Sequence, residues 1–452
     1  DKGLSRAEGV EIARRLVAAG QIDFLNIIRG HIETDAALSN VIPVQGMASA
    51  PHLDFAGEVR AETKFPVFHA ARIADVATAR HAIAEGKLDM VGMTRAHIAD
   101  PHIGLKVTEN RENEIRPCVG ATYCLDRIYE GHEALCIHNP ATGREATMPQ
   151  VVRPTDGPKR KIVVVGAGPA GLEAARVSAE RGHAVTLFEA APQPGGQVRL
   201  LSRMRRRAEL IGIADWRAER CEALGVDMRF NVYAEAADVL AEEPDVVIVA
   251  TGGLPDTGIL DEGEELVASG WDILTGDVKP GGDVLLYDDN GAHPGLQAAE
   301  FIAEAGARLE LVTPERFFAA DVGGLNHVPY ARCFKEHGVT ITINTRLVSV
   351  RREGNKLAAT LGSDYSDRTE KRLVDQVVVE HGTLPLDELY FDLKPRSVNL
   401  GEVDYQALIA VQPQELATNP DGKFRLFRIG DAVASRNIHA AIYDALRLCV
   451  TL

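Results

Sequence analysis

The first 112 residues alternate between amphipathic helices and short strands that are almost continuously apolar. A capping-box pattern at Ser5 and Glu8 opens the first helix, in which apolar positions recur at helical spacing as far as Gly20. Such alternation is typical of a parallel sheet with helices on both faces. The expected elements are a helix at 5–20, a strand at 23–28, a helix at 51–62, a strand at 66–70, a helix at 75–85 and a strand at 89–93.

Two loops that follow consecutive strands of this region have the composition of a phosphate site. They contain Ala71-Arg72 and Thr94-Arg95, so each joins a backbone-accessible turn to an arginine. Amides and a guanidinium together suit a phosphate, and (β/α)8 barrels bind phosphate after strands seven and eight. Surface arginines would explain either loop alone, but the repetition favours a site. Because three strands cannot close a barrel, we interpret residues 1–112 as the C-terminal part of a flavin-binding (β/α)8 barrel.

The strongest motif is the sequence GAGPAG, which starts at Gly166 between an apolar strand and a helix. Gly166 permits the tight turn, Gly168 lets the backbone approach a pyrophosphate, and Gly171 lets the helix pack closely on the strand. The next strand ends at Glu189, which is placed to accept hydrogen bonds from ribose hydroxyls. The complete order of strand, loop, helix and acidic residue predicts a Rossmann-like domain that binds a dinucleotide.

Two further glycine-containing segments complete this expected domain. The run that contains Gly196 and Gln197 offers bare backbone to a diphosphate. Near the end of the chain, an apolar strand at 426–429 closes on Gly430-Asp431 and is followed by a helix at 439–448. These segments extend the domain over both sides of an insertion.

The insertion begins as a second dinucleotide-type unit, with a strand at 282–287, a helix at 296–305 and a strand at 309–312. Its loop carries Asp288 and Asp289 where a phosphate would face the helix N-terminus. Carboxylates at that place repel a phosphate. We therefore expect this nested unit to keep the fold and to have lost the ligand.

Composition and charge narrow the function classes. A chain of 452 residues suggests three domains, and its net charge of −16 with no basic tract argues against nucleic acid or an anionic membrane as a partner. No apolar run approaches the length of a membrane helix, and the chain opens without a signal-peptide pattern. The cysteines show no disulfide-scaffold pattern, which fits a reducing, cytoplasmic compartment.

Three of the six cysteines, Cys118, Cys124 and Cys136, fall in one Gly-containing, loop-like stretch at 116–139 between the two nucleotide-binding regions. Clustered thiolates are what an iron–sulfur centre requires, because soft sulfur ligands hold iron. The alternative is that the three cysteines are buried and act as small apolar side chains.

The order of these parts resembles the trimethylamine dehydrogenase and 2,4-dienoyl-CoA reductase family. The sequences FHA at 68–70, GMTRAHIADP at 92–101 and RLC at 447–449 are similar to the dimethylglycine and N-methylproline demethylases of that family, whose members carry the front half of the barrel before the position of Asp1. The expected organisation is the C-terminal part of an FMN-binding barrel at 1–112, an iron–sulfur loop at 113–147, a linker at 148–160, a Rossmann-like FAD or ADP domain at 161–278 and 384–452, and a nested degenerate NAD(P)-type domain at 279–383.

The resemblance implies three redox or nucleotide groups: FMN in the barrel, an iron–sulfur cluster beside it, and FAD or ADP in the GAGPAG domain. It also implies an electron-transfer flavoprotein as electron acceptor and a homo-oligomer, expected as a dimer. The implied positions are Ala71, Arg72, Thr94 and Arg95 for the FMN phosphate; Gly166, Gly168, Gly171, Glu189, Gly196, Gln197 and Asp431 for the adenine nucleotide; and Cys118, Cys124 and Cys136 for the metal.

The chain departs from the family pattern at two positions. Ala121 stands where the family has the middle cysteine of CxxCxxC, so the cluster is 4Fe–4S with one non-cysteine ligand, 3Fe–4S, or absent. Ile128 replaces an aromatic residue of the amine-binding bowl, which weakens a cation–π cage and leaves room for a carboxylate-bearing substrate. Candidates for the fourth ligand are Asp126, His132 and His138.

The strand at 23–28 directs its C-terminal end toward the mouth of such a barrel, where Arg29, His31 and Asp35 follow. Arg29 suits a clamp on a substrate carboxylate, His31 could take the amine proton, and Asp35 could orient His31 or balance the substrate charge. The alternative is that all three are solvated loop residues.

The resulting hypothesis is a flavin-dependent oxidative N-demethylase of an N-methylated amino acid, such as dimethylglycine or N-methylproline. A rival is an NAD(P)H-dependent enoyl reductase of the 2,4-dienoyl-CoA type. A third hypothesis, from another class, is a non-catalytic electron-transfer or scaffold fragment.

Overall fold

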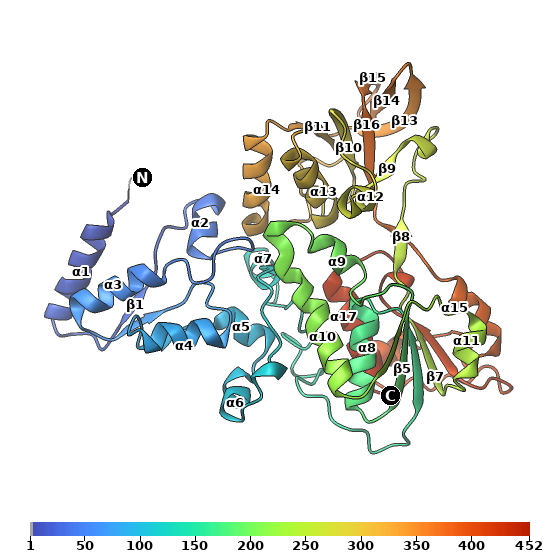
Figure 1. Ribbon diagram of the computed structural model, residues 1–452, viewed down its shortest axis with the longest axis horizontal. Helices are drawn as coiled ribbons and strands as arrows, with labels where there is room; N and C mark the ends of the chain where they lie inside the picture. Colours follow the sequence, from blue (N-terminus) through green and yellow to red (C-terminus); the bar gives the residue numbers. More distant parts are fainter. Residues whose placement is uncertain (1–2) are drawn as a thin grey trace.

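The computed structural model describes residues 3–452, in which three α/β units follow one another along the chain (Figure 1). The first unit has three short parallel strands in the order β1-β2-β3. The capping box at Ser5 and Glu8 is present at the start of its first helix. Its elements are α1 (Arg6–Ala18), β1 (Leu25–Ile27), α2 (Asp35–Val41), α3 (Leu53–Thr63), β2 (Val67–His69), α4 (Val76–Ala84), β3 (Met90–Val91), α5 (Thr94–Ala99), α6 (Ile103–Thr108) and η1 (Glu112–Glu114).

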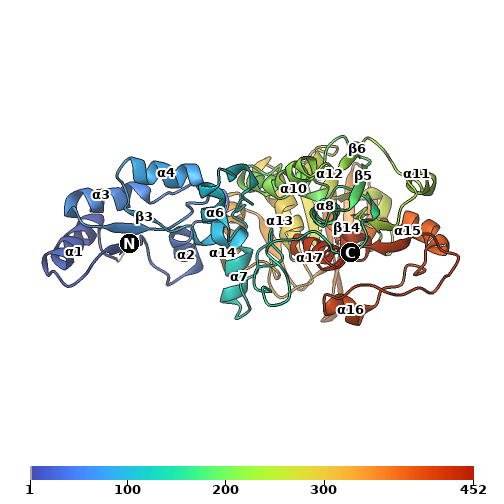
Figure 2. The same ribbon diagram turned by 90° about the horizontal axis from the view of Figure 1, so that it is seen from below.

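The two faces of this first sheet differ. Helices α3 and α4 lie on one side of it (Figure 2), where Leu25 and Val67 are buried in a common core. On the opposite side, Phe24, Ile28 and Met90 are 48%, 66% and 50% exposed. Apolar side chains therefore line both faces of this sheet, and the face without helices leaves them exposed to solvent.

The second unit is a five-stranded parallel sheet in the order β18-β7-β4-β5-β6. This order is that of a Rossmann fold, in which the chain reverses direction across the sheet between β4 and β7. The buried strand β4 (Lys161–Val165) and helix α17 pack against α8 (Pro169–Glu180). The other elements are β5 (Ala184–Glu189), α9 (Gln197–Leu201), η2 (Arg205–Ile211), α10 (Gly212–Ala223), β6 (Asp227–Phe230), α11 (Ala236–Ala241), β7 (Val246–Val249), α15 (Glu388–Leu393), η4 (Lys394–Arg396), α16 (Tyr405–Ile409), β18 (Arg425–Arg428), η5 (Gly430–Ala432) and α17 (Ile438–Cys449).

The third unit is inserted into the second and joined to it by a two-stranded antiparallel ribbon of β8 (Gly253–Pro255) and β17 (Thr383–Pro385). Its parallel sheet has the order β12-β11-β10-β16-β9, and β13, β14 and β15 form a separate antiparallel sheet. The elements are η3 (Glu264–Leu266), β9 (Ala268–Ser269), α12 (Gly270–Thr275), β10 (Asp283–Asp288), α13 (His293–Glu304), β11 (Arg308–Val312), α14 (Gly324–Glu336), β12 (Thr340–Thr342), β13 (Arg346–Glu353), β14 (Lys356–Ser363), β15 (Ser366–Val374) and β16 (Gln376–Glu380).

One expected boundary was wrong. The nested unit was expected to begin at residue 279, but β9 pairs in parallel with β16 and therefore belongs to the nested sheet. A strand of two residues, Ala268 and Ser269, has no periodicity that a sequence pattern could reveal.

The cysteine stretch runs between the three units and contains the helix α7 (Tyr123–Tyr129). In Figure 1 it lies at the centre of the molecule, and α7 contacts α14 of the nested unit. Within residues 3–452, no helix is both long and apolar enough to cross a bilayer.

Candidate functional site

The GAGPAG loop forms an open cradle at the N-terminus of α8. Gly166 has a φ of +103°, which favours glycine. A β-carbon on Gly171 would overlap the Gly166 carbonyl oxygen, so helix and strand cross as closely as glycine allows. Among residues 3–452, by contrast, a β-carbon on Gly168 would meet no atom within 4 Å, and no side chain caps α8. The free space and free amides at this helix N-terminus fit a phosphate group.

The other expected adenine-nucleotide residues surround the same loop. A β-carbon on Gly196 would lie 3.2 Å from the Cα atom of Gly168. Gln197 Nε2 donates a hydrogen bond to Asp431 Oδ2 at 3.0 Å, and burial raises the pKa of Asp431. Residues separated by more than two hundred positions thus line one cradle. Their contact with a nucleotide stays a prediction.

Glu189 lies at the mouth of the same loop. Its carboxylate accepts hydrogen bonds from the backbone N–H of Ala167 at 2.6 Å and of Ala191 at 2.8 Å. The side chain is therefore held beside the GAGPAG backbone, as the fingerprint requires for a ribose contact.

The corresponding loop of the nested unit is closed by its own acid. Asp288 Oδ1 accepts from the backbone N–H groups of Asn290 and Gly291, both at 3.1 Å. A β-carbon on Gly295 would lie 2.6 Å from the Asp288 carboxyl carbon. Burial raises the pKa of Asp288 to about 7. A carboxylate thus fills the position where a helix N-terminus would otherwise face a phosphate.

The expected FMN-phosphate turns combine strained backbone with a partly buried cation. Ala71 and Arg72 have φ values of +107° and +56°. Non-glycine residues in this region cost energy and cluster at functional sites. Thr94 starts α5, and Arg95 Nη1 donates to the Pro43 carbonyl at 2.9 Å. Burial lowers the pKa of Arg95, and within residues 3–452 no carboxylate forms an ion pair with it, so a phosphate would complement its charge.

The Arg72 guanidinium does not remain at its own turn, contrary to the expectation for a phosphate ligand. Its Nε donates to the Met47 carbonyl at 3.0 Å, and its Nη2 forms an ion pair with Glu209 of the Rossmann-like unit. The side chain is only 5% exposed. The backbone amides of this turn remain available to a phosphate, and the contact of Arg72 with FMN phosphate stays a prediction.

The three clustered cysteines are all free thiols, of which Cys124 and Cys136 are buried and Cys118 is partly buried. Burial, then the neighbouring thiols, raise the pKa of Cys124 to about 12, and burial raises the pKa of Cys136. The backbone N–H of His138 donates to Cys136 Sγ at 3.4 Å. Thiols whose pKa is raised by burial and by neighbouring thiols still become thiolates when a soft metal binds. This donor set therefore fits an iron–sulfur centre with three cysteine ligands.

The candidates for a fourth ligand differ in their surroundings, and His138 Nε2 and Asp126 Oδ1 are buried without a hydrogen-bond partner among residues 3–452. Which of them would bind stays a prediction. Asp126 accepts from Asn326 Nδ2 at 2.6 Å, and burial raises its pKa to about 7. His138 Nδ1 accepts from Arg217 Nη1 at 2.7 Å, and His132 is exposed. Ala121 is buried, as a ligand at its position would be.

A buried charge network beneath the cysteine stretch was missed by sequence reasoning. Arg217 donates to Glu173 at 2.8 Å and to the His138 carbonyl at 2.8 Å, and Arg176 donates to Glu173 at 2.6 Å. Burial alone would raise the pKa of Glu173, but the two arginines lower it to about 2. The available signal was an acid and a base three residues apart on the otherwise small and apolar helix α8. The network fixes the cysteine stretch to α8 and α10.

The expected catalytic residues are not assembled with one another. Arg29 and His31 are exposed in the loop after β1, and the acid nearest to His31 Nδ1 is Glu33, at 3.9 Å. Asp35 is the first residue of α2 and turns to the nested unit, where a β-carbon on Gly324 would lie 3.0 Å from its carboxyl carbon. Within residues 3–452, Asp35 makes no hydrogen bond or ion pair with His31, because the Thr34 cap starts a helix that places Asp35 beside Gly324. The role of Asp35 stays a prediction.

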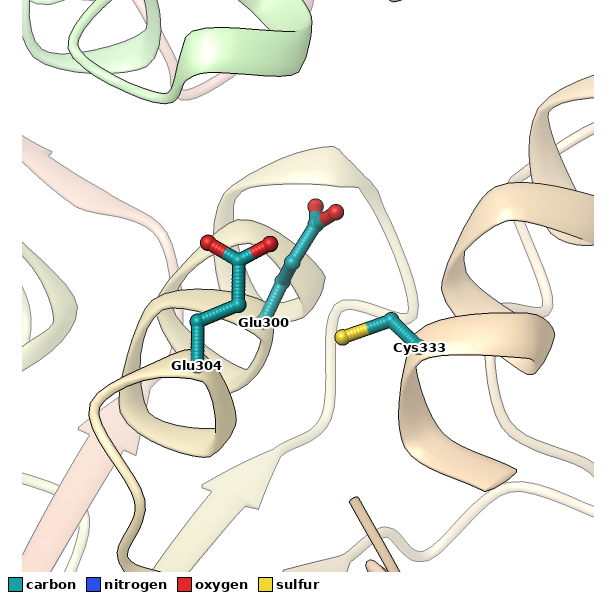
Figure 3. A group of neighbouring side chains, drawn as sticks. All are labelled: Glu300, Glu304 and Cys333. Atoms are coloured by element: carbon teal, nitrogen blue, oxygen red, sulfur yellow. The ribbon is translucent and has the colours of Figure 1, made fainter. Parts of the chain in front are cut away.

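A second group of metal-type side chains, Glu300, Glu304 and Cys333, lies between α13 and α14 (Figure 3). Glu300 is already paired through both oxygens with Arg206, at 2.9 Å and 2.6 Å. A cation would have to displace this buried ion pair, so the group is better explained as an interdomain contact.

Comparison with known proteins identifies the fold and the family. Residues 164–210 match the model of an NAD(P)-binding Rossmann-like domain. The chain is 63% identical over 446 residues to a probable N-methylproline demethylase of Rhizobium meliloti, which covers 99% of this chain. It is 45% identical over 459 residues to the N,N-dimethylglycine/sarcosine dehydrogenase of Chromohalobacter salexigens, again over 99% of this chain. It spans 66% of the length of each of these relatives.

A solved complex of 2-naphthoyl-CoA reductase has the same fold, with a TM-score of 0.84 and 27% sequence identity over 100% of this chain and 63% of that one. The agreement covers both dinucleotide-fold units, the cysteine stretch between the units and the N-terminal strands. The chain therefore belongs to the trimethylamine dehydrogenase and 2,4-dienoyl-CoA reductase family, within which it is similar to N-methylproline and dimethylglycine demethylases.

Proposed function

We propose that this chain is the larger part of a flavin-dependent oxidative demethylase that acts on an N-methylated amino acid. The observation that carries the proposal is the 63% identity, over nearly the whole chain, to a probable N-methylproline demethylase. The open GAGPAG cradle and the closed nested loop agree with it. Together they favour an adenine nucleotide that stays bound in the GAGPAG cradle, and they oppose a second, exchangeable nucleotide in the nested unit.

FMN would supply the hydride acceptor, and the methyl group would leave as formaldehyde after water adds to the substrate iminium. The amides around Ala71 and the guanidinium of Arg95 would hold the phosphate of FMN. The exposed apolar face that carries Phe24, Ile28 and Met90 supports the assignment of β1 to β3 to a barrel, since the inside of a barrel is where such a face would be covered.

In this proposal Arg29 clamps the substrate carboxylate, and His31 takes the ammonium proton that must leave before hydride transfer. Cys118, Cys124 and Cys136 would hold a cluster that passes single electrons to an electron-transfer flavoprotein. A cytoplasmic homodimer is proposed on the resemblance to the family.

The test is turnover of N-methylproline and dimethylglycine with a dye acceptor, with formaldehyde measured directly. Arg29→Ala should weaken apparent affinity about tenfold or more, because a partly desolvated clamp contributes about 1.5–3 kcal/mol. His31→Ala should lower turnover, because the ammonium proton of the substrate then loses its acceptor. Protein that carries FMN but releases no formaldehyde from either amine would contradict the proposal.

A second candidate is an enoyl reductase, favoured by the likeness to 2-naphthoyl-CoA reductase. It requires NADH or NADPH to reduce the flavin. Because Asp288 occupies the anion position of the nested loop, we expect neither nucleotide to bleach the flavin under anaerobic conditions. Rapid bleaching by either one would favour the reductase. Protein without flavin would favour a non-catalytic scaffold.

A further inference from the structure

The guanidinium of Arg72 connects three parts of the molecule. The backbone of Arg72 belongs to the proposed FMN-phosphate turn, where Ala50 N–H donates to the Arg72 carbonyl at 3.1 Å. Its Nη1 lies 2.6 Å from where a β-carbon on Gly120 would stand, so the cysteine stretch covers it as closely as glycine permits. Its Nη2 is paired with Glu209. Within residues 3–452, Glu209 is the one carboxylate in an ion pair with this buried arginine.

Glu209 belongs to η2 (Arg205–Ile211), which follows the adenine-nucleotide cradle almost directly. Gly196 is the N-cap of α9, and three residues after α9 the segment η2 begins. The intervening Met204 is buried, and α9 and η2 pack against each other. A nucleotide on the amides of Gly196 and Gln197 would therefore order the segment that presents Glu209.

The same segment binds the other units on its remaining sides. Arg206 pairs with Glu300 of the nested unit, and the Arg206 stem fills the space that a side chain on Gly46 would need. Leu210 is fully buried against Val119 of the cysteine stretch. The segment is thus held on several sides, so a shift at the cradle cannot be absorbed by solvent-exposed loop alone.

We propose that Glu209 is a positioning residue that couples the two nucleotide sites. By holding the Arg72 side chain it keeps the FMN-phosphate turn in its strained conformation, with its amides free for the phosphate. Occupancy of the adenine-nucleotide cradle strengthens FMN retention through this contact. The inference rests on the proposed function, since it requires both FMN and an adenine nucleotide to bind.

The physical basis is the cost of a buried cation. The Arg72 side chain is 5% exposed and Glu209 is 50% exposed. Loss of the carboxylate therefore leaves a desolvated guanidinium that donates only to the Met47 carbonyl among residues 3–452. An ordered η2 holds the carboxylate in place at lower entropic cost than a mobile one. Coupling of this kind between two sites typically changes affinity about fivefold or more.

The test measures the rate at which FMN leaves the purified holoenzyme after dilution, followed by the rise in FMN fluorescence. Glu209→Gln removes the charge and keeps the shape. Gly168→Ala removes nucleotide binding at a cradle position where a β-carbon meets no protein atom. Glu219→Gln, an exposed acid of the same domain, is the matched control. Bound adenine nucleotide is measured in each variant after denaturation.

We expect Glu209→Gln and Gly168→Ala each to speed FMN loss about fivefold, and the double variant to lose FMN no faster than either single one. Glu209→Gln should retain its adenine nucleotide, and Glu219→Gln should behave as wild type. A purely structural role would instead give additive effects. Additivity, or an unchanged FMN rate in Gly168→Ala despite nucleotide loss, overturns the coupling and leaves the proposed function intact. Wild-type protein without FMN overturns both.

Discussion

The two dinucleotide-fold units of this chain share a strand–loop–helix plan and treat the helix N-terminus in opposite ways. At α8 the loop is lined by glycine, no side chain of the described residues caps the helix, and space remains beside Gly168. At α13 the loop amides donate to Asp288, whose carboxylate packs against Gly295. One unit keeps the N-terminal end of its helix open for a ligand, while the other fills that position with its own acid.

Acidic side chains also lie beside two other helix N-termini of the nested unit. A β-carbon on Gly270, the first residue of α12, would lie 2.7 Å from Glu380 Oε2. The N-terminus of α14 meets Asp126 of the cysteine stretch at Gly323 and Asp35 of the first unit at Gly324. The comparison indicates that a dinucleotide-type fold can serve for packing between units when acidic side chains of the chain lie at its helix N-termini.

The largest effect that tests this comparison should come from Gly171→Ala. Its β-carbon would overlap the Gly166 carbonyl oxygen at the crossing of β4 and α8, where neither backbone can yield cheaply. We expect a loss of about 3 kcal/mol in the free energy of unfolding and no bound adenine nucleotide. Thermal unfolding and nucleotide content check this. Gly168→Ala, in open space, should lose the nucleotide and keep the melting temperature of the nucleotide-free protein.

The next effect concerns the acid of the open unit. Glu189→Ala removes the carboxylate that accepts from Ala167 and Ala191 and that is placed for the ribose. Because hydrogen bonds to charged groups contribute about 1.5–3 kcal/mol, nucleotide affinity should fall about tenfold or more. Isothermal titration with ADP measures it. Unchanged affinity would mean that the cradle does not use this acid.

In the nested unit, removal of an acidic charge should raise the free energy of unfolding. The pKa of Asp288 is raised to about 7, chiefly by burial, with Asp289 and Asp321 adding to the shift. That of the nearby Glu380 is raised to about 8. An acid whose pKa is higher in the folded than in the unfolded state contributes stability that is full below its unfolded pKa and is lost as pH rises through its folded pKa.

The contribution of these two acids to the free energy of unfolding of the wild-type protein should therefore decrease as the pH rises from about 4 to about 8. Asp288→Asn keeps an oxygen for the loop amides and removes the charge. It should raise the free energy of unfolding at pH 8 by about 1–2 kcal/mol and reduce the pH dependence. Urea unfolding at pH 5 and pH 8 decides. Destabilisation at pH 8 would contradict the assignment of a buried, charge-disfavouring site.

The smallest effect should come from the docking of α14. A β-carbon on Gly323 would overlap the Asp126 side chain, which can rotate in part, so Gly323→Ala should cost about 1 kcal/mol. Gly104→Ala in α6, where a β-carbon would meet no atom within 4 Å, should be neutral or slightly stabilising. Denaturation curves of both variants make the comparison. Equal stabilities would show that this docking contact tolerates a methyl group.

The sequence alone predicted those features that are local in the chain. The Rossmann-like cradle is one of them, because strand, glycine loop, helix and Glu189 fall within one short segment whose pattern records their geometry. The carboxylates of the nested loop are another, because Asp288 follows its strand directly. Apolar periodicity predicted where helices and strands occur. A strand as short as β9 has no such pattern, so the expected boundary of the nested unit lay too far along the chain.

Tertiary structure decided which side chains of distant segments meet. Asp35 turns to α14, nearly three hundred residues away, and Arg72 turns to Glu209, which lies 137 residues further along the chain. Asn326 reaches the cysteine stretch across 200 positions to Asp126. Spacing along the chain fixes the face on which a residue lies, but its partner depends on how three units pack and on which buried charges must be neutralised.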